Sequence, residues 1–395
     1  MTTTTHHDVS HLLTDEMLAA FDQRAATYDR DNTFFTEDFD ALRDSGYLLA
    51  AVPDDLGGGG LGLDEYVKLH SRLGYAASPT ALGVNMHVYW TGVAADLRRA
   101  GDHSCDFLLD AAVRGEVLAA LHGEAGNDLP LLLSSSTAER VDGGWKINGQ
   151  KIFGSLSPVW TLGGFHAMST DDPAAPQIVH GFVTNDAPGL VVVDTWDTFG
   201  MRATQSQDTM FHDVFVPDAQ VALVCPAGFA GAGMFHVAIF AWALMGFAAV
   251  YQGIAHRAFD ITIEKAPQRS SVALSRSMAY HPEVQHLVAD MRIGLDAIDA
   301  MIERTTTDWA SGVEHEDWPV RLVATRQFVI NQTMAIVGWA LDVSGGSASF
   351  KRSRLEQLFR DSSMGRFHPG NTLLAHELIG KLCLGLDPDE SPLWG

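Results

Sequence analysis

The chain has 395 residues, of which 46% are hydrophobic and 19% charged, as is usual for a globular protein. A chain of this length is too long for one simple core, so we expect two or three packed subdomains. The formal net charge of -23 argues against nucleic acid and against an anionic membrane as partners, because both need a positive protein surface.

The cysteines and the N-terminal tract bear on the compartment. Cys105, Cys225 and Cys383 are far apart and match neither metal-ligand nor disulfide spacing. We therefore expect no metal site and a cytoplasmic, reducing location. The Thr/His tract at residues 1–7 contains neither a basic nor an apolar segment, so we expect no signal peptide.

One apolar stretch is long enough to suggest a membrane-spanning helix instead. Residues 219–256 contain no Asp, Glu, Lys or Arg, and residues 237–254 are apolar over a length that could cross a bilayer. A helix buried on all sides of a helical bundle is also apolar all round. Because His236, Gln252 and several glycines dilute the run and its flanks have no basic bias, we favour the buried helix.

Taken in order, the chain begins with residues 12–118, which are predicted to be helices joined by short loops. Residues 118–224 are predicted to form strands, since short β-branched or aromatic runs alternate there with turn residues. These runs are residues 179–184, 190–193, 209–211 and 214–216. No helical segment separates them, which favours an antiparallel sheet or barrel over a parallel one. A Rossmann fingerprint is absent from the sequence.

The most informative stretch of the strand region is INGQKIFGS at residues 147–155. Asn148-Gly149 between apolar runs is a strong signal for a β-hairpin. Phe153 and Ser155, two residues apart on one strand, are predicted to share a face. An aromatic ring beside a hydroxyl suits a flat heterocycle, although such a pair is more often core packing and solvent contact.

From residue 233 onwards the pattern is helical again. Residues 284–302 keep one apolar face over five turns. Residues 322–343 form a second predicted helix, ended by Ser344-Gly345-Gly346, and residues 372–386 form a last one. Helices, then a sheet, then a set of four helices is an order typical of one fold.

Several short motifs agree with that order. They are VPDDLGG at residues 52–58, INGQK at 147–151, GMRAT at 200–204, FHDVFVP at 211–217 and LEQLFRD at 355–361. In number, spacing and order they resemble the acyl-CoA dehydrogenase superfamily of flavoproteins. The resemblance implies an α+β fold with an N-terminal helical domain (1–117), a middle antiparallel β-barrel or sheet domain (118–228) and a C-terminal four-helix bundle (229–395).

The resemblance also implies a flavin site. Phe153 would pack on the isoalloxazine ring, and Ser155 would donate a hydrogen bond to flavin N5. Arg269 stands where the family has an Arg that binds the pyrophosphate, often across a subunit interface. Gln285, Gly345 and Gly346 would shape that second part of the site. The cofactor is expected to be FAD, with reduced FMN as the alternative.

The chain departs from the family at the catalytic base. In the family a Glu in a Tyr-Glu-Gly-Thr loop removes the substrate proton, whereas the corresponding loop here is GRFHPGN at residues 365–371. The family's alternative Glu would fall near Phe240, in the run without carboxylates. Glu377 is expected on the surface. Near the adenosine site, Asp342 replaces a Gln, and an acid there would repel a pyrophosphate.

Histidines stand where the acid is missing. His87 lies on the helix that in this family approaches the substrate cavity, and His368 replaces the acid of the loop. With Ser155 they resemble the flavin-dependent monooxygenases built on this fold, in which a group titrating near neutrality handles protons. Each His alone is more often structural, but the pair within this fold favours a catalytic role.

We therefore expect a cytoplasmic monooxygenase that uses reduced flavin and O2 to hydroxylate or N-oxygenate a small organic substrate. A separate flavin reductase would supply the reduced flavin, and a homotetramer or homodimer is expected from the family. Two alternatives stay open. One is an acyl-CoA dehydrogenase with a base other than Glu, such as His368. The other is a catalytically incomplete subunit of a heteromeric acyl-CoA dehydrogenase.

Overall fold

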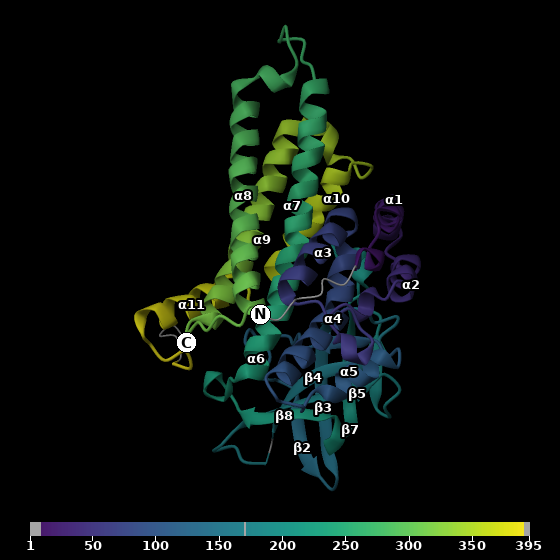
Figure 1. Ribbon diagram of the computed structural model, residues 1–395, viewed down its shortest axis with the longest axis vertical. Coiled ribbons are helices and arrows are strands. Elements are labelled where there is room, and N and C mark those ends of the chain that lie inside the picture. Colours follow the sequence, from purple (N-terminus) through teal and green to yellow (C-terminus); the bar gives the residue numbers. More distant parts are fainter. Residues whose placement is uncertain (1–8, 170, 391–395) are drawn as a thin grey trace.

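The computed structural model describes residues 9–169 and 171–390, so the Thr/His tract at residues 1–7 lies outside the described residues. The first part of the chain is helical, as predicted (Figure 1). Its helices are α1 (Asp15–Asp31), α2 (Thr36–Asp44), α3 (Leu63–Ala76), α4 (Ser78–Arg99) and α5 (Asp106–Val113). Helix α4 is central, because every residue from 78 to 97 is buried.

The middle of the chain forms a sheet at one end of the molecule (Figure 1). Its strands are β1 (Leu118–Leu121), β2 (Thr137–Val141), β3 (Gly144–Gly154), β4 (Leu162–Ser169), β5 (Gln177–Thr184), β6 (Leu190–Val193), β7 (Gln207–Pro217) and β8 (Val221–Pro226). The order is β6-β7-β3-β2-β4-β5-β8, with β1 paired to β4.

Most strand pairs are antiparallel, as predicted, but β1 and β2 both run parallel to β4. The two parallel strands share one edge of β4, since β5 already occupies the other. β1 pairs with its first half and β2 with its end. Helix α4 covers this region. Trp90 packs so closely on Gly164 that a Cβ there would lie 2.5 Å from the indole.

The predicted hairpin at Asn148-Gly149 is wrong. Residues 144–154 form one continuous strand, β3, and the turn that joins it to β2 is at Asp142-Gly143, where Gly143 has a φ of +75°. Gly149 instead marks an irregularity in the pairing with β7. A Cβ at position 149 would lie 2.4 Å from Ser136 Oγ, so the glycine permits a close approach rather than a turn.

A second correction concerns β7. The runs at residues 209–211 and 214–216, predicted as separate strands, belong to the single strand β7. His212 and Asp213 lie between the two runs. Asp213 has a φ of +52°, and its backbone N–H donates to Asn148 Oδ1. These two polar residues therefore form an irregular point within one strand and do not end it.

The C-terminal part is helical, with long helices standing beyond the sheet (Figure 1). The helices are α6 (Met234–Ile239), α7 (Met245–Lys265), α8 (Pro282–Ala310), α9 (Trp318–Ser344), α10 (Arg354–Ser363) and α11 (Thr372–Leu384). The predicted helices at residues 284–302 and 322–343 lie inside α8 and α9. The last helix stops at Leu384 rather than at residue 386, because Gly385 follows with a φ of +70°.

The long apolar run forms α6, a π-helical turn (Phe240–Leu244) and α7. By length and composition the segment Met234–Gln268 could cross a membrane, but 78% of its most apolar window is buried inside the protein. Helix α7 packs against α3, α4, α8 and α9. The structure thus confirms the prediction of a helix buried within a bundle.

Candidate active site

A cavity of about 390 Å³ lies where the three parts of the chain meet. Its walls come from α4, from the loops that follow β1 and β3, from the π-helical turn and α7, and from residues 364–371. Most of the lining side chains are apolar, and a few polar groups stand among them. The volume and the lining are those of a small-molecule site. π-Helical turns are frequent at such sites.

Phe153 and Ser155 both lie on the cavity wall, at the end of β3. Phe153 has a φ of +60°, a strained conformation for an aromatic residue, and 44% of its surface is exposed. Its ring meets Trp196 edge to face, with ring centroids 5.9 Å apart. An aromatic ring held in a strained, exposed position on a cavity wall offers a surface for a flat ligand.

The hydroxyl of Ser155 belongs to a row of hydroxyl groups. Ser155 Oγ lies 2.7 Å from Ser206 Oγ, which lies 2.8 Å from Thr204 Oγ1. Thr204 donates its proton to the carbonyl of Met201, so it accepts from Ser206, and Ser206 in turn accepts from Ser155. In this order Ser155 Oγ presents an acceptor to the cavity. To donate to a ligand, its hydroxyl would have to rotate away from Ser206.

The loop at residues 365–371 places His368 against the cavity. Its ring stacks on Phe247, with centroids 4.8 Å apart, and Nε2 shares a hydrogen bond of 2.8 Å with the hydroxyl of Tyr251. Burial and, to a smaller extent, the charge of Arg326 lower the pKa of His368 to about 3. Burial raises the pKa of Tyr251 well above its usual value. Both groups are therefore neutral at pH 7.

Arg326 on α9 binds the backbone of this loop. Its guanidinium donates to the carbonyl oxygens of Gly365 (2.9 Å), His368 (3.1 Å) and Gly370 (2.6 Å). Burial lowers the pKa of Arg326 to about 10, so the side chain keeps its charge at neutral pH. Our sequence analysis missed this residue. The available signal was a single basic residue inside the mostly apolar helix predicted at residues 322–343.

Two carboxylates, Glu124 and Asp128, are present among the described residues that line the cavity. Glu124 accepts hydrogen bonds from the backbone N–H groups of Ser135 (3.0 Å) and Ser136 (3.1 Å) and pairs with the buried Lys151. Burial acts to raise the pKa of Glu124, but its interactions with His166 and Lys151 outweigh this and hold the pKa well below its usual value. Glu124 is thus a poor proton acceptor.

Asp128 is the exposed one of the two, and its Oδ1 accepts from the side-chain amide of Asn371 at 3.2 Å. Phe240, near which the family's alternative Glu would fall, lines the cavity with an apolar ring. No carboxylate comes from the loop at residues 365–371. These placements leave the cavity without a buried, unengaged carboxylate among the described residues.

His87 is not among the residues that line the cavity, although its neighbour Met86 is. The ring is buried, and its Nδ1 accepts a hydrogen bond from the N–H of Leu118 at 2.9 Å. Burial lowers the pKa of His87 to about 4. The structure therefore does not bring His87 together with His368 and Ser155.

The predicted phosphate-binding group lies at the other end of the bundle. Arg269 follows the C-terminal end of α7, whereas the cavity is at its N-terminal end, about 30 Å away along a helix of 21 residues. Arg269 donates to the carbonyl of Val343 and packs on Gly345, which has a φ of +65°. Gln285 donates to the carbonyl of Ala279, and Gly346 is exposed. Within one chain these residues do not reach the cavity.

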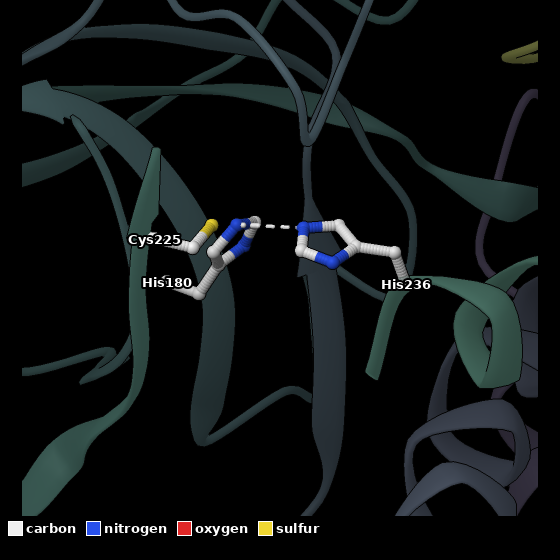
Figure 2. A group of neighbouring side chains, drawn as sticks. All are labelled: His180, Cys225 and His236. Carbon is white, nitrogen blue, oxygen red and sulfur yellow. Dashed lines mark hydrogen bonds between the residues drawn. The ribbon is translucent and has the colours of Figure 1, made fainter. Parts of the chain in front are cut away.

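His180 on β5, Cys225 on β8 and His236 on α6 form a buried cluster, with their potential ligand atoms within 4.8 Å of one another (Figure 2). The N–H of Gly233 donates to Nδ1 of His236 at 3.3 Å, so the proton of this neutral ring is on Nε2. That proton meets Nε2 of His180 at 3.2 Å. A hydrogen bond between the two rings accounts for their approach, and it leaves Nδ1 of His180 without a hydrogen-bond partner among the described residues.

Two further polar groups on the wall, Tyr89 and His122, were missed by our sequence analysis. His122 follows directly after the fully apolar strand β1, and Tyr89 lies on the buried helix α4. A polar residue at the end of an apolar strand was the only signal for His122. Nothing in the periodicity distinguishes Tyr89 from a core residue.

Comparison with known families gives three matches along the chain. Residues 3–103 match the N-terminal domain of acyl-CoA dehydrogenases, residues 123–214 the middle domain and residues 245–372 the C-terminal domain. Together they cover most of the chain, in the order that the fold shows.

Individual relatives point to more than one reaction. The chain is 28% identical to the amino sugar nitrososynthase RubN8 of Streptomyces rubradiris, over 96% of this chain and 90% of the relative. It is 25% identical to the putative acyl-CoA dehydrogenase YdbM of Bacillus subtilis, over 88% and 90%. The solved structure of KijD3 with FMN and dTDP-3-amino-2,3,6-trideoxy-4-keto-3-methyl-D-glucose is 25% identical, with a TM-score of 0.84 over 98% of this chain and 96% of that one.

Proposed function

The chain belongs to the acyl-CoA dehydrogenase superfamily and is a flavin-dependent oxidoreductase, and we propose that it is a monooxygenase that acts on a small organic substrate. One oxygen atom of O2 would enter the substrate and the other would leave as water, with two electrons from reduced flavin. N-oxygenation of an amine is the form of this reaction that we favour.

The observation that carries this proposal is the chemistry of the loop at residues 365–371. A dehydrogenase of this superfamily uses a carboxylate, in this loop or at the alternative position near Phe240, to remove a substrate proton. In this chain the loop presents a neutral His368, bonded to Tyr251, and Glu124 is held by Lys151 and by backbone N–H groups. With a pKa of about 3, His368 does not titrate near neutrality as the sequence led us to expect, and it is too weak a base for α-proton abstraction.

The cavity suits a flavin ring. Bound in its reduced form, a flavin supplies the electrons that activate O2. Phe153, strained and exposed, would pack against the ring, and Ser155 would bind its N5 edge. Because Ser155 presents an acceptor while it donates to Ser206, it matches the N–H that N5 carries in reduced flavin. His368 would position the reactants as a neutral hydrogen-bonding group, with Tyr251 holding its Nε2.

Two relatives favour an amine as the substrate. RubN8 is named an amino sugar nitrososynthase, and the KijD3 structure holds FMN together with an amino sugar nucleotide. The sheet is mostly antiparallel and lacks a dinucleotide-binding βαβ unit among the described residues, so reduced flavin would come from a separate reductase. FMN, rather than FAD, suits the distance between the cavity and Arg269.

An acyl-CoA dehydrogenase remains the second candidate, because Asp128 is an exposed carboxylate beside the cavity and YdbM is named a putative acyl-CoA dehydrogenase. A subunit that needs a homologous partner is the third, supported by the separation of Arg269 from the cavity. The purified protein discriminates among them. Mixed with chemically reduced FMN, O2 labelled with 18O and a panel of small primary amines, a monooxygenase gives labelled N-oxygenated product.

Other results would reject the proposal. Anaerobic bleaching of bound oxidised flavin by an acyl-CoA would identify a dehydrogenase. Flavin binding only in a co-purified complex would identify a partner-dependent subunit.

His368→Ala tests the role of the loop. We expect it to lower product formation about 100-fold or more while the flavin affinity stays close to wild type. The free energy of unfolding should fall by only about 1–3 kcal/mol, because the buried hydroxyl of Tyr251 loses its partner. The control is His376→Ala, an exposed histidine on α11 outside the cavity. Steady-state product formation and flavin titration are the measurements. Unchanged turnover in His368→Ala would mean that the loop is only structural.

A further inference from the structure

Two polar atoms on the cavity wall have no hydrogen-bond partner among residues 9–169 and 171–390. They are Nε2 of His122 and the hydroxyl oxygen of Tyr89, and both are buried. Buried polar groups are almost always hydrogen-bonded, because an unsatisfied one costs about 1–3 kcal/mol. Two such atoms on residues of one cavity wall therefore indicate a bound partner there, either a ligand or an ordered water that a ligand can displace.

The protonation of His122 follows from its neighbours. The N–H of Leu131 donates to Nε2 of His166 at 3.3 Å. Burial is the main cause that lowers the pKa of His166 to about 4, so its ring is neutral and its single proton is on Nδ1. Nδ1 of His166 lies 3.2 Å from Nδ1 of His122 and donates to it. His122, also neutral because its pKa lies well below its usual value, then keeps its proton on Nε2.

Glu124 is the other group that could form a hydrogen bond with Nε2 of His166, but it is too far away. Oε2 of Glu124 lies 3.7 Å from Nε2 of His166, beyond hydrogen-bond distance. The oxygens of Glu124 already accept from backbone N–H groups, serine hydroxyls and Lys151. The hydrogen bond from Leu131 therefore decides which nitrogen of His166 carries the proton.

The backbone is shaped to make that bond. Leu131 is buried and has a φ of +75°, a strained conformation for a branched side chain. The segment that carries it is fastened at Glu124, which accepts from the N–H groups of Ser135 and Ser136. Strain at Leu131 is thus held in place by a buried carboxylate, and the result is a fixed N–H on His122, a residue of the cavity wall.

We propose that His122 and Tyr89 form a polar subsite that donates hydrogen bonds to an uncharged acceptor on the substrate. Carbonyl, ether and hydroxyl oxygens and unprotonated amines have the required lone pair, whereas an ammonium group does not. Neither residue carries a charge, since burial also raises the pKa of Tyr89 well above its usual value. The subsite rests on the proposed function in one respect, namely that this cavity binds the substrate.

The test compares two ligands of one shape, acetophenone and α-methylstyrene, which differ in a carbonyl oxygen and a methylene group. Their affinities for the protein loaded with oxidised flavin are measured by calorimetry. We expect wild type to prefer acetophenone. His122→Leu should weaken acetophenone about tenfold and leave α-methylstyrene unchanged, as loss of one buried hydrogen bond predicts. His122→Gln keeps a donor and should restore part of the preference.

Two more variants complete the design. Met86→Leu, an apolar change in the same wall, should affect both ligands alike. His166 does not line the cavity and acts only as a positioning residue. His166→Leu should nevertheless reduce the preference, though less than His122→Leu does, without weakening α-methylstyrene. If that variant does not fold, 15N NMR of histidine-labelled wild type reports the protonated nitrogen directly, and an unprotonated Nε2 on His122 would overturn the proposal.

Equal affinity of wild type for the two ligands, or equal losses in His122→Leu, would also overturn it. Because these measurements need no turnover, they separate the subsite from the proposed reaction. A clear preference in a protein that does not oxygenate amines would reject only the monooxygenase. Labelled product from a protein without the preference would reject only the subsite.

Discussion

At the scale of single residues, Asp361 is the buried carboxyl group at which the three parts of the chain meet. It accepts a hydrogen bond from the N–H of Met201 (2.7 Å), which precedes β7, and one from Ser78 Oγ (3.0 Å), at the start of α4. Burial is the main cause that raises its pKa from the ordinary 3.8 to about 6. The carboxylate is therefore ionised at neutral pH at a cost to stability.

The sign of the pH dependence follows from that shift. Between about pH 4 and pH 6 the folded protein binds more protons at Asp361 than the unfolded chain does, so this group lowers the free energy of unfolding as pH rises. The full loss is about 3 kcal/mol. We expect the free energy of unfolding of Asp361→Asn, measured with denaturant, to gain on that of wild type as the pH rises through this range. The reason is that only wild type loses stability at this position. Asp110→Asn, on the exposed face of α5, controls for the lost charge. A parallel pH profile in Asp361→Asn would contradict the assignment.

The site residues differ in how far the sequence could predict them. Phe153, Ser155 and His368 are reached through short motifs of known position, and the structure places all three on one cavity. His122 and Tyr89 are not reached. Whether a buried polar atom lacks a partner depends on side chains distant in sequence, such as His166, and on the unusual backbone of Leu131. Neither is readable from a local pattern.

At the scale of elements, the loop at residues 365–371 depends on one side chain of α9. Arg326 binds three of its carbonyl oxygens, and a lysine has neither the planar fork nor the reach to do so. We expect Arg326→Lys to lower the free energy of unfolding by about 2 kcal/mol and to lower turnover more than flavin affinity. Arg321→Lys, an exposed arginine on the same helix, is the matched control. Denaturant unfolding and steady-state turnover are measured together, and unchanged turnover would separate the loop from catalysis.

The π-helical turn is kept in place by a close contact between helices. Gly92 of α4 faces Trp242, and a Cβ on Gly92 would lie 2.2 Å from the indole. We expect Gly92→Ala to destabilise the protein by about 1–3 kcal/mol, because neither helix can move without disturbing the buried core. Gly338→Ala on α9, where a Cβ meets nothing within 4 Å, should be neutral or stabilising. Thermal unfolding of the two variants measures the difference. Equal stabilities would show that the helices adjust freely.

Helices and strands were not predicted equally well. The apolar faces of α8 and α9 repeat over many turns, so their periodicity identifies them even without tertiary information. The prediction of a hairpin at Asn148-Gly149 was wrong because a glycine is needed at position 149 for close packing against Ser136. That contact is distant along the chain. The same cause joined the two short runs of β7 into one strand, since Asp213 is supported by Asn148. Strand pairing is non-local, and local turn signals cannot settle it.

At the scale of the whole molecule, the two predicted parts of the flavin site lie at opposite ends of α7. The cavity reaches Phe247 near the start of the helix, and Arg269 lies beyond its end. A flavin mononucleotide in the cavity cannot bridge that distance within one chain. If the prediction for Arg269 is right, a second copy must bring it to a neighbouring cavity, which is why the expected homotetramer or homodimer matters for the choice between FAD and FMN.

Arg269→Ala tests both points. We expect it to weaken FAD about tenfold and to leave FMN unchanged, because only FAD carries an adenosine half long enough to reach a second copy. Arg276→Ala, a nearby exposed arginine stacked on Tyr280, is the control. Flavin titration gives the affinities, and native mass spectrometry gives the number of copies in each complex. Equal losses of FAD and FMN would mean that Arg269 acts through the stability of the bundle end, where it supports Val343 and Gly345. Unchanged affinity for both would mean that the family's phosphate contact is not used in this chain.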